Sequence, residues 1–367
     1  MKKLGLGMMR LPLIDEESKS VDIRQTKAMI DLLMEKGYNY FDTAHPYLNG
    51  NSEKAVKETL TKRYPREYFI LTSKMPIFNL ESSDQMEDIF EEQIDRCGVE
   101  YFDYYLLHNV SSKHEKKFTD IDSFEFIVKK KEEGKIRHIG ISSHDTPEFL
   151  EDILLKHPEI EVVQLQINYQ DWSDEIINSK KCYEVACKYN KPVIVMEPLK
   201  GGALLNIPEN VKEEVKVYEK EEYLSLALAF CANLENVMVI LSGVNNIREV
   251  EENIRIFENI KELNDNTYML LDKISELISE SIQIKCSYCN YCISHCQNNI
   301  NIPQLFRFYN SQKLLKQSHS LSMYYNNFIS HGNAKASDCI KCNSCLDYCP
   351  QKINIPEMLE KIVETFE

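Results

Sequence analysis

Between Lys3 and Leu263 the chain alternates short apolar runs with longer segments of helical spacing, and this alternation restricts the fold more than any other feature. The runs with strand composition number eight and are KLGLGMM from Lys3, YNYFDT from Tyr38, YFILTSK from Tyr68, FDYYLLH from Phe102, IRHIGIS from Ile136, VVQLQIN from Val162, PVIVMEP from Pro192 and VMVILSG from Val237. Expected helices between them include Asp22–Lys36, Ser83–Cys97, Ser123–Glu133, Asp174–Lys188, Glu221–Ala232 and Ile247–Asn259. Glycines at Gly37, Gly98 and Gly134 stand where three of these helices should end.

Eight nearly continuous apolar strands, each followed by a helix, predict a parallel (β/α)8 TIM barrel of about 250 residues. A doubly wound open sheet is the alternative fold. It is less favoured because GLGMMR after the first strand keeps only the first two glycines of the dinucleotide-binding pattern.

The tail carries the same cysteine pattern twice, Cys-x2-Cys-x2-Cys-x3-Cys, from Cys286 and again from Cys339. Ile-Asn-Ile-Pro follows the last cysteine of each run at the same offset. Eight of the 12 cysteines lie in these runs, and clustered cysteine without a secretory signal indicates metal rather than disulfides. The scattered four, which are Cys97, Cys182, Cys187 and Cys231, are expected to be small buried apolar residues.

In bacterial two-cluster proteins the fourth cysteine of such a run ligates the other cluster. We therefore expect two 4Fe–4S clusters, the first held by Cys286, Cys289, Cys292 and Cys349 and the second by Cys339, Cys342, Cys345 and Cys296. Zinc is the alternative metal, but zinc sites usually take two separated Cys-x2-Cys pairs, and two tandem triplets do not divide in that way.

The tail from Ile284 to about Glu360 resembles two-cluster ferredoxins. It departs from them at Gln297, where a proline is usual, and in the long gap from Gln297 to Asp338, which contains a helix-compatible insert from Gln304 to Phe328. The insert resembles the helical ferredoxin type found within larger redox enzymes. We expect a barrel over 1–265, a connecting helix over 266–283, and a small, mostly helical ferredoxin-like domain over 284–367.

Three neighbouring strands of the expected barrel deliver polar side chains to one rim. Asp42 ends the second strand, Lys74 the third and His108 the fourth, and Tyr47 lies in the loop after Asp42. Catalytic side chains of such barrels gather at the C-terminal ends of the strands. A lysine held by an aspartate favours the phenolate of a nearby tyrosine, which predicts a lowered tyrosine pKa. The set fits a tyrosine acid and a histidine that positions a carbonyl oxygen.

Six ordered motifs then show a resemblance to the aldo-keto reductases over about Leu4 to Phe257: FDTAHPYLNGNSE, LTSKMP, FDYYLLHNV, IRHIGISS, MEPLKGG and LSGVNNIREVEENI. The resemblance implies a (β/α)8 barrel that binds NADP(H) across the rim. It implies Tyr47 as proton donor, Lys74 and Asp42 as its tuning pair, and His108 as carbonyl orienter.

The resemblance also implies nucleotide contacts. These are Met8, Arg10, Asp42, Ser142, Ser143, Gln164, Met196, Ser242, Gly243, Asn245 and Asn253. Two positions depart from the family pattern: Met196 replaces the aromatic residue that stacks on nicotinamide, and Asn245 replaces the basic residue at the 2′-phosphate, with Arg248 nearby. Phosphate recognition favours arginine or lysine, so the choice between NADP(H) and NAD(H) stays open. Loops over 109–120 and 200–218 are expected to set the substrate.

Net charge and hydropathy exclude some partners. The formal net charge of −15 argues against general nucleic-acid binding. No apolar stretch is long enough for a membrane span, and the apolar start is broken by glycines and Arg10, unlike a signal peptide. We expect a cytoplasmic protein.

The two halves handle electrons differently, because nicotinamide carries a hydride and an iron–sulfur cluster carries one electron. One reading is an NAD(P)H-dependent oxidoreductase that reduces a small carbonyl, with clusters that are structural or redox-sensing. In another reading the clusters exchange electrons with a redox protein partner or a further cofactor, such as a flavin. The alternative class is a nicotinamide-binding sensor with an electron-transfer or interaction module and no carbonyl turnover.

Overall fold

The computed structural model describes residues 2–174, 177–281, 283–315, 325–326, 328–329 and 332–367. The chain forms two compact units. Unit 1 comprises Met1–Ser173, Asn178–Pro198 and Ser225–Leu263, and unit 2 comprises Asp174–Ile177, Leu199–Leu224 and Asn264–Glu367. The domain boundaries expected from the sequence stay a prediction.

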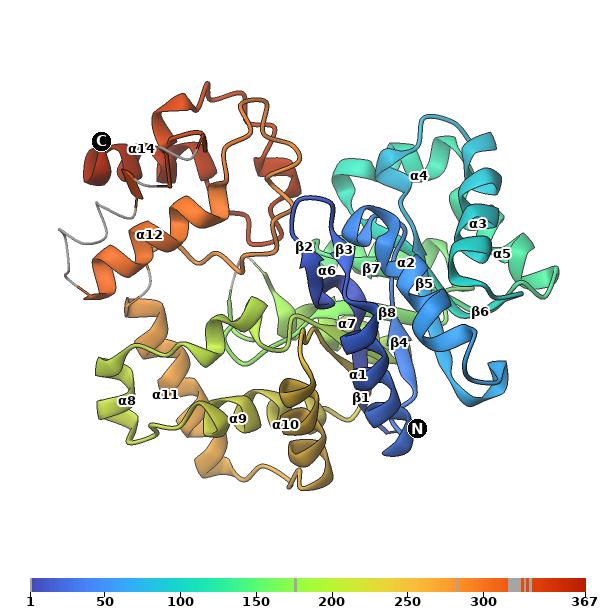
Figure 1. Cartoon of the computed structure of the whole chain (residues 1–367), viewed down its shortest axis with the longest axis horizontal. Coiled ribbons are helices and arrows are strands. Elements are labelled where there is room, and N and C mark those ends of the chain that lie inside the picture. Colours follow the sequence, from blue (N-terminus) through green and yellow to red (C-terminus); the bar gives the residue numbers. More distant parts are fainter. Residues whose placement is uncertain (1, 175–176, 282, 316–324, 327, 330–331) are drawn as a thin grey trace. The chain divides into compact units, whose positions relative to one another are not determined.

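Unit 1 contains a closed barrel of eight parallel strands (Figure 1), in the order β1-β10-β9-β8-β7-β6-β5-β4. Its strands are β1 (Leu4–Gly7), β4 (Tyr40–Asp42), β5 (Ile70–Met75), β6 (Phe102–Val110), β7 (Ile136–Ser143), β8 (Val162–Gln166), β9 (Val193–Met196) and β10 (Val237–Ser242). Strand β1 pairs in parallel with both β10 and β4, which closes the barrel. The predicted (β/α)8 fold is confirmed, each predicted strand is present, and the open sheet is excluded.

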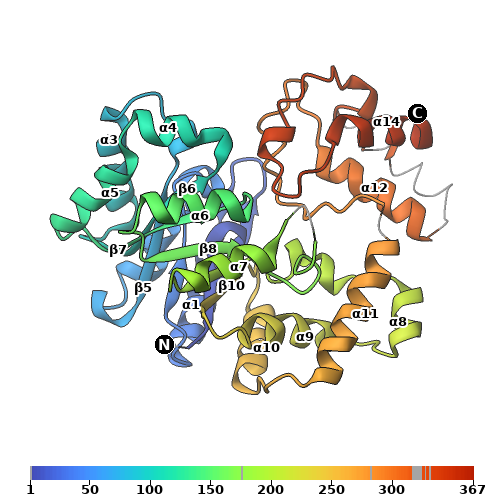
Figure 2. The same cartoon turned by 180° about the vertical axis from the view of Figure 1, so that it is seen from behind.

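Helices surround the barrel strands, with α3 and α5 beside β5 and β6 in Figure 1 and with α6 and α7 packed together in Figure 2. They are α1 (Ile23–Glu35), α2 (Asn51–Val56), α3 (Asp84–Cys97), α4 (Glu115–Asp120), α5 (Ser123–Glu132), α6 (Pro147–Lys156), α7 (Ser179–Lys188), α9 (Lys220–Ala232) and α10 (Ile247–Glu258). Asp22 caps α1 by accepting from the Gln25 amide, and Gly98 ends α3 in the left-handed region with φ +65°. Residues 175–176 of the predicted 174–188 helix lie outside the described residues.

Side chains inside the barrel change from apolar to polar along the strands. A buried apolar cluster fills the interior and contains Tyr40, Leu106, Val162, Ile194, Val239 and Leu241. Because alternate residues of a strand share one face, the next inward positions are Asp42 on β4, His108 on β6 and Gln164 on β8. These three buried polar side chains therefore lie at the C-terminal end of the barrel, next to the apolar cluster.

A two-stranded antiparallel hairpin, β2 (Leu13–Asp15) with β3 (Ser20–Val21), precedes α1. The sequence analysis did not predict it, since strands this short and polar carry no clear alternation.

Unit 2 holds α8 (Glu209–Val215), α11 (Asp265–Ser281), α12 (Ile302–Leu315) and α14 (Ile355–Phe366). Helices α12 and α14 pack together, and each begins at the second isoleucine of its Ile-Asn-Ile-Pro. Those isoleucines, Ile302 and Ile355, are buried in one core with several of the cysteines. Part of the predicted helical insert, 316–324 and 327, lies outside the described residues. No helix in the described part of the chain combines the length and apolarity that a membrane span needs.

Candidate active site and cluster sites

The four predicted catalytic side chains meet at the rim of the barrel. Lys74 Nζ donates to Asp42 Oδ1 at 2.5 Å and to the Thr43 carbonyl at 2.9 Å, and it lies 3.5 Å from Tyr47 Oη. The Tyr47 and His108 rings approach edge to face, with centroids 5.9 Å apart. Lys74 is fully buried, so its ammonium is held by fixed protein groups rather than by water.

Burial and charge act against each other in the Asp42–Lys74 pair. Burial lowers the pKa of Lys74 and raises that of Asp42, and the ion pair opposes both shifts. Burial also raises the pKa of Tyr47 well above its usual value, and the charges of Asp42 and Glu197 add to the rise. The predicted lowering is therefore wrong in direction here, because desolvation of the phenol and the charges of Asp42 and Glu197 all raise its pKa. Tyr47 consequently holds its proton at neutral pH.

His108 lies where β6 loses its regular register with β7. The pairing shifts between Leu107 and Val110, and Asn109 has φ +57°. Such irregularities re-aim side chains near active sites. Burial, followed by the charge of Lys74, lowers the pKa of His108 well below its usual value. A neutral imidazole in contact with the rings of Tyr47 and Phe78 can donate a hydrogen bond without adding a positive charge.

Predicted nicotinamide contacts surround the same residues. Gln164 Nε2 donates to Asp42 Oδ2 at 3.3 Å, and Gln164 Oε1 is buried with no hydrogen-bond partner among the described residues. A buried unpaired carbonyl costs free energy unless a donor arrives, and the carboxamide of nicotinamide is such a donor. Ser142 and Ser143 end β7, where Ser142 Oγ accepts from the Asn109 amide and Ser143 Oγ donates to the Val110 carbonyl. The residues present therefore fit a nicotinamide ring.

Predicted contacts to the rest of the nucleotide come together after β1 and β10. Asn253 Nδ2 donates to Ser242 Oγ at 2.6 Å, and a β-carbon at Gly243 would lie 3.3 Å from Arg10 Cδ. Met8, which directly follows β1, is fully buried, and its carbonyl accepts from Ser52 Oγ. Gly243 thus lies beside the aliphatic part of the Arg10 side chain, just after β10.

Acidic side chains stand close to Asn245, the predicted 2′-phosphate position. The Asn245 amide donates to Glu249 Oε2 at 3.1 Å. Arg248 is exposed, and its Nε donates to Glu252 at 3.2 Å. Glu249 thus accepts from the backbone amide at the predicted phosphate position.

Glu197 is a rim residue that the sequence reasoning missed. It directly follows Met196, and its charge reaches the Tyr47 phenol. It has φ +58°, an unfavourable conformation for glutamate, and its carbonyl accepts from Asn168 Nδ2 at 3.0 Å. Its place right after a barrel strand was the available signal.

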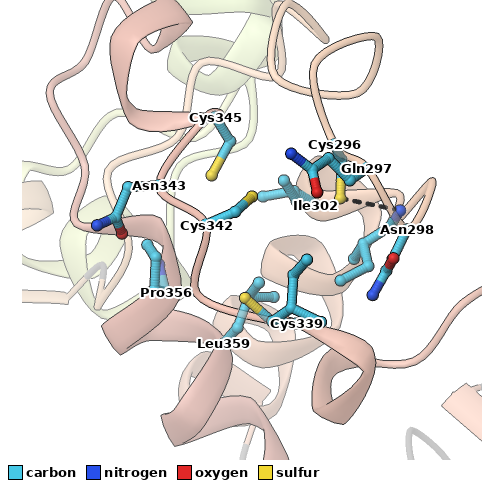
Figure 3. A pocket seen from close by; sticks show the side chains of 12 residues that line it. Cys296, Gln297, Asn298, Ile302, Cys339, Cys342, Asn343, Cys345, Pro356 and Leu359 are labelled. Atoms are coloured by element: carbon cyan, nitrogen blue, oxygen red, sulfur yellow. Dashed lines mark hydrogen bonds between the residues drawn. The ribbon is translucent and has the colours of Figure 1, made fainter.

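Four cysteines line one hollow in unit 2 (Figure 3), namely Cys296 from the first run and Cys339, Cys342 and Cys345 from the second. The hollow measures about 330 Å³ including its part open to solvent, and Ile300, Ile302, Pro356 and Leu359 also line it. The Ile300 amide donates to Cys296 Sγ at 3.4 Å. These are the four cysteines predicted for the second cluster.

The other four predicted ligands influence one another electrostatically. Cys289, Cys286 and Cys349 all act on the Cys292 thiol, as does Cys345 of the second set, and burial raises the pKa of Cys286 to about 12. The Tyr288 amide donates to Cys286 Sγ at 3.4 Å, matching the amide bond at Cys296. The rings of His295 and Tyr348, each just before the last cysteine of its run, stack on each other.

Both sets fit a 4Fe–4S cluster. Cysteine binds iron as the thiolate and releases its proton on binding, and amides that donate to sulfur are typical around such clusters. In the described part of the chain, no three Cys, His, Asp or Glu side chains converge on a single ion. In Figure 3 the side chains of Cys296, Cys339, Cys342 and Cys345 line the hollow together.

Comparison with known proteins agrees with both halves. Residues 3–276 match the model of the Aldo/keto reductase family, and residues 285–353 match that of the 4Fe-4S dicluster domain. An aldo-keto reductase of Mycobacterium avium is 26% identical over 285 residues, which are 75% of this chain and 90% of that protein. The NADH-specific methylglyoxal reductase of Escherichia coli is 27% identical over 293 residues, which are 68% of this chain and 88% of that protein.

Solved structures show the same barrel. The holo form of an aldo-keto reductase from Bacillus halodurans has a TM-score of 0.58 at 22% identity, covering 74% of this chain and 91% of that one. An aldo-keto reductase from Klebsiella pneumoniae in complex with NADPH also has a TM-score of 0.58, at 19% identity. The match covers 74% of this chain and 90% of that one. The chain belongs to the aldo/keto reductase family, and it ends in a 4Fe–4S dicluster domain. It is an oxidoreductase with an iron–sulfur tail.

Proposed function

We propose that the chain reduces a small aldehyde or ketone by hydride transfer from NAD(P)H. The observation that carries this proposal is the buried Asp42–Lys74 pair, with Lys74 Nζ 3.5 Å from Tyr47 Oη. The aldo/keto reductase family and the name of the E. coli relative, a methylglyoxal reductase, support a small carbonyl substrate.

Each rim residue has a part in the transfer. The bound nicotinamide supplies the hydride to the carbonyl carbon. Tyr47 gives its phenolic proton to the carbonyl oxygen, and Lys74 then stabilises the negative charge left on Tyr47, with Asp42 holding the ammonium in place. Neutral His108 donates a hydrogen bond to the same oxygen and orients it. Gln164 Oε1, which has no hydrogen-bond partner among the described residues, would accept from the carboxamide of a bound nicotinamide and so orient the ring.

We infer that NADH is preferred over NADPH. Glu249 occupies the Asn245 amide, and Arg248 is already paired with Glu252. A 2′-phosphate at this position would meet a carboxylate rather than a free cation. The E. coli relative is named as NADH-specific, whereas the K. pneumoniae structure contains NADPH.

We further propose that the tail holds two 4Fe–4S clusters with crossed last ligands. The hollow formed by Cys296, Cys339, Cys342 and Cys345 supports this arrangement, because one ligand comes from the other run. Bound clusters would supply one-electron transfer. A redox protein is the expected partner, and a reducing cytoplasm, where thiolate ligands stay reduced, is the expected compartment.

The catalytic proposal is tested with Tyr47→Phe in the full chain. Loss of the general acid is expected to lower kcat/KM for a small aldehyde by about 10²- to 10⁴-fold. NADH binding, followed by fluorescence, should change little. Tyr68→Phe is the control, since Tyr68 is 60% exposed. Full activity in Tyr47→Phe would contradict the proposed acid.

A second candidate function, a nicotinamide-binding electron-transfer module without carbonyl turnover, is favoured by the cysteine-lined sites. The two candidates are separated by adding NADH or NADPH to anaerobically purified protein while recording cluster absorbance. Bleaching without any aldehyde turnover would favour the module. Turnover with no spectral change in the clusters would favour carbonyl reduction with structural or sensing clusters.

A further inference from the structure

A buried polar cluster lies on the outer side of β5, the strand that carries Lys74. Its members are each 0% exposed and are Glu53 of α2, Ser73 of β5, Gln93 of α3 and Tyr105 of β6. The layer between a barrel and its helices is usually filled by apolar side chains. Because buried polar groups must give up their water, such a cluster holds its members in one arrangement only if they bond to each other.

The Gln93 side chain is the centre of this cluster. Its Nε2 donates to Glu53 Oε1 at 2.7 Å, to Ser73 Oγ at 2.7 Å and to the Lys74 carbonyl at 3.2 Å. Its Oε1 accepts from the Tyr105 hydroxyl. The orientation of the amide is fixed by these neighbours, because the backbone carbonyl of Lys74 can only accept. One side chain of α3 therefore contacts α2, β5 and β6 at once.

The elements that Gln93 joins carry three of the four predicted catalytic side chains. Lys74 lies on β5, and its own carbonyl is one of the acceptors. Helix α2 directly follows the turn Tyr47–Gly50, and Tyr105 precedes His108 by three residues on β6. A displacement of the Gln93 amide would therefore shift these elements relative to one another.

Helix α3 also contacts the turn that carries Tyr47. The three residues after Tyr47 all have left-handed backbones, with φ values of +52° at Leu48, +57° at Asn49 and +81° at Gly50. Such a backbone persists only where its surroundings hold it. A β-carbon at Gly50 would lie 3.0 Å from Arg96 Cζ, so the guanidinium of α3 packs directly against the turn.

Charged side chains connect this turn to the buried cluster. Arg96 Nη1 lies 3.6 Å from Glu53 Oε2, an oxygen that has no hydrogen-bond partner among the described residues. Arg96 also pairs with Glu92, one turn earlier on α3, and Glu92 Oε2 lies 2.9 Å from Nε2 of His45. Since His45 precedes Tyr47 by two residues, side chains of one helix reach the chain on both sides of Tyr47.

We propose that Gln93 is a positioning residue that fixes the Lys74 strand against α3, the helix whose other side chains hold the Tyr47 turn. The inference rests on the proposed carbonyl reduction. Lys74 Nζ lies 3.5 Å from Tyr47 Oη, at the limit of hydrogen-bond reach, so a small displacement of either residue removes this contact. Misplacement by about 1 Å can lower a rate by about 10²-fold.

The test compares Gln93→Met and Tyr105→Phe with the unchanged chain at full length. Gln93→Met removes the amide at similar side-chain length, and Tyr105→Phe removes only the hydroxyl that donates to Gln93. We expect kcat for a small aldehyde to fall about 10- to 100-fold in Gln93→Met and less in Tyr105→Phe, with KM for NADH little changed. Gln85→Met is the matched control and should keep kcat, because the exposed Gln85 accepts from the Glu81 amide at the start of the same helix.

Two further measurements separate positioning from stability. In a double-mutant cycle, Tyr105→Phe should lower kcat no further once Gln93→Met is present, since Tyr105 acts through Gln93. Crystal structures of the unchanged chain and of both variants give the distance from Lys74 Nζ to Tyr47 Oη. We expect this distance to be longer in the variants than in the unchanged chain.

Unchanged kcat in both single variants, an equal loss in Gln85→Met, or additive losses in the cycle would overturn the proposal. If Gln93→Met does not fold, Tyr105→Phe still decides, because loss of a hydroxyl leaves the packing of the ring in place. If the unchanged chain reduces no aldehyde, the proposed function fails. The distance from Lys74 to Tyr47 in the crystal structures then decides by itself whether Gln93 positions Lys74.

Discussion

At the scale of single residues, the site depends on charges placed where water is absent. Lys74 and Asp42 are 0% and 2% exposed, and neither has a bulk-water partner to replace the other. A buried pair contributes little net stability, but removing one member leaves the other charge without compensation. The same exclusion of water raises the pKa of Tyr47, so its phenol stays protonated at neutral pH.

Lys74→Met is expected to destabilise the barrel by about 3–5 kcal/mol at neutral pH, because Asp42 is left as an unpaired buried carboxylate. Without the ammonium, burial raises the pKa of Asp42 further above its unfolded value. The folded state then binds the extra proton, so the loss of stability shrinks as pH falls through that window. Denaturant unfolding at neutral and mildly acidic pH, followed by circular dichroism, measures both effects.

Lys62→Met is the matched control for this change, since Lys62 is exposed and paired with Glu58 on one helix face. Lys62→Met should lower the free energy of unfolding by at most about 1 kcal/mol at either pH. A Lys74→Met loss as small as that of Lys62→Met would contradict a buried ion pair.

Asn245→Arg is expected to improve kcat/KM for NADPH relative to NADH. The new guanidinium can bind a 2′-phosphate that Glu249 now opposes. Steady-state kinetics with both nucleotides measure the ratio. Arg255→Lys is the control, because Arg255 lies in the last turn of α10, whereas Asn245 precedes that helix. An unchanged ratio would show that the phosphate does not lie at Asn245.

At the scale of elements, the strands were predictable because each is a nearly continuous apolar run, whereas the hairpin β2–β3 has too few residues to show a period. The rim tetrad was predictable because strand ends are fixed by the same pattern. The sequence pattern did not identify Glu197 and Lys200 as residues of interest. The burial of Lys200 and the positive φ of both residues arise from tertiary packing around an acidic and a basic side chain, types that a sequence pattern places at the surface. The predicted direction of the Tyr47 pKa shift was wrong for the same reason, because the sequence does not show that the phenol is desolvated.

Gly140 on β7 shows how closely the barrel strands are packed. A β-carbon there would lie 2.5 Å from Val162 Cγ1 and 2.7 Å from Leu106 Cδ2. Gly140→Ala is therefore expected to destabilise the barrel by about 1–3 kcal/mol through overpacking. Gly7→Ala is the control, because its β-carbon would have no neighbour nearer than 3.6 Å. Thermal or denaturant unfolding of both variants measures their stabilities. Equal stabilities would contradict the close packing of Val162 and Leu106 against Gly140.

At the scale of the whole chain, the two copies of the cysteine run and its Ile-Asn-Ile-Pro segment depend on each other. The repeated Ile-Asn-Ile-Pro starts α12 in one copy and α14 in the other, and the two helices share one core. The last cysteine of each copy is thereby carried toward the other copy, as the hollow around Cys296 shows. If each copy lends a ligand, neither cluster can form from one run alone.

Crossed ligation predicts the iron content of two double variants. Cys286→Ala with Cys349→Ala removes two ligands of one cluster, so the other cluster should remain. Cys286→Ala with Cys296→Ala takes one ligand from each cluster and should impair both. If each run closed on its own cluster, the two results would be exchanged. Iron and sulfide assays with EPR of the anaerobically purified full-length variants distinguish these outcomes, and Cys187→Ala, outside both runs, should keep the iron of the unchanged chain.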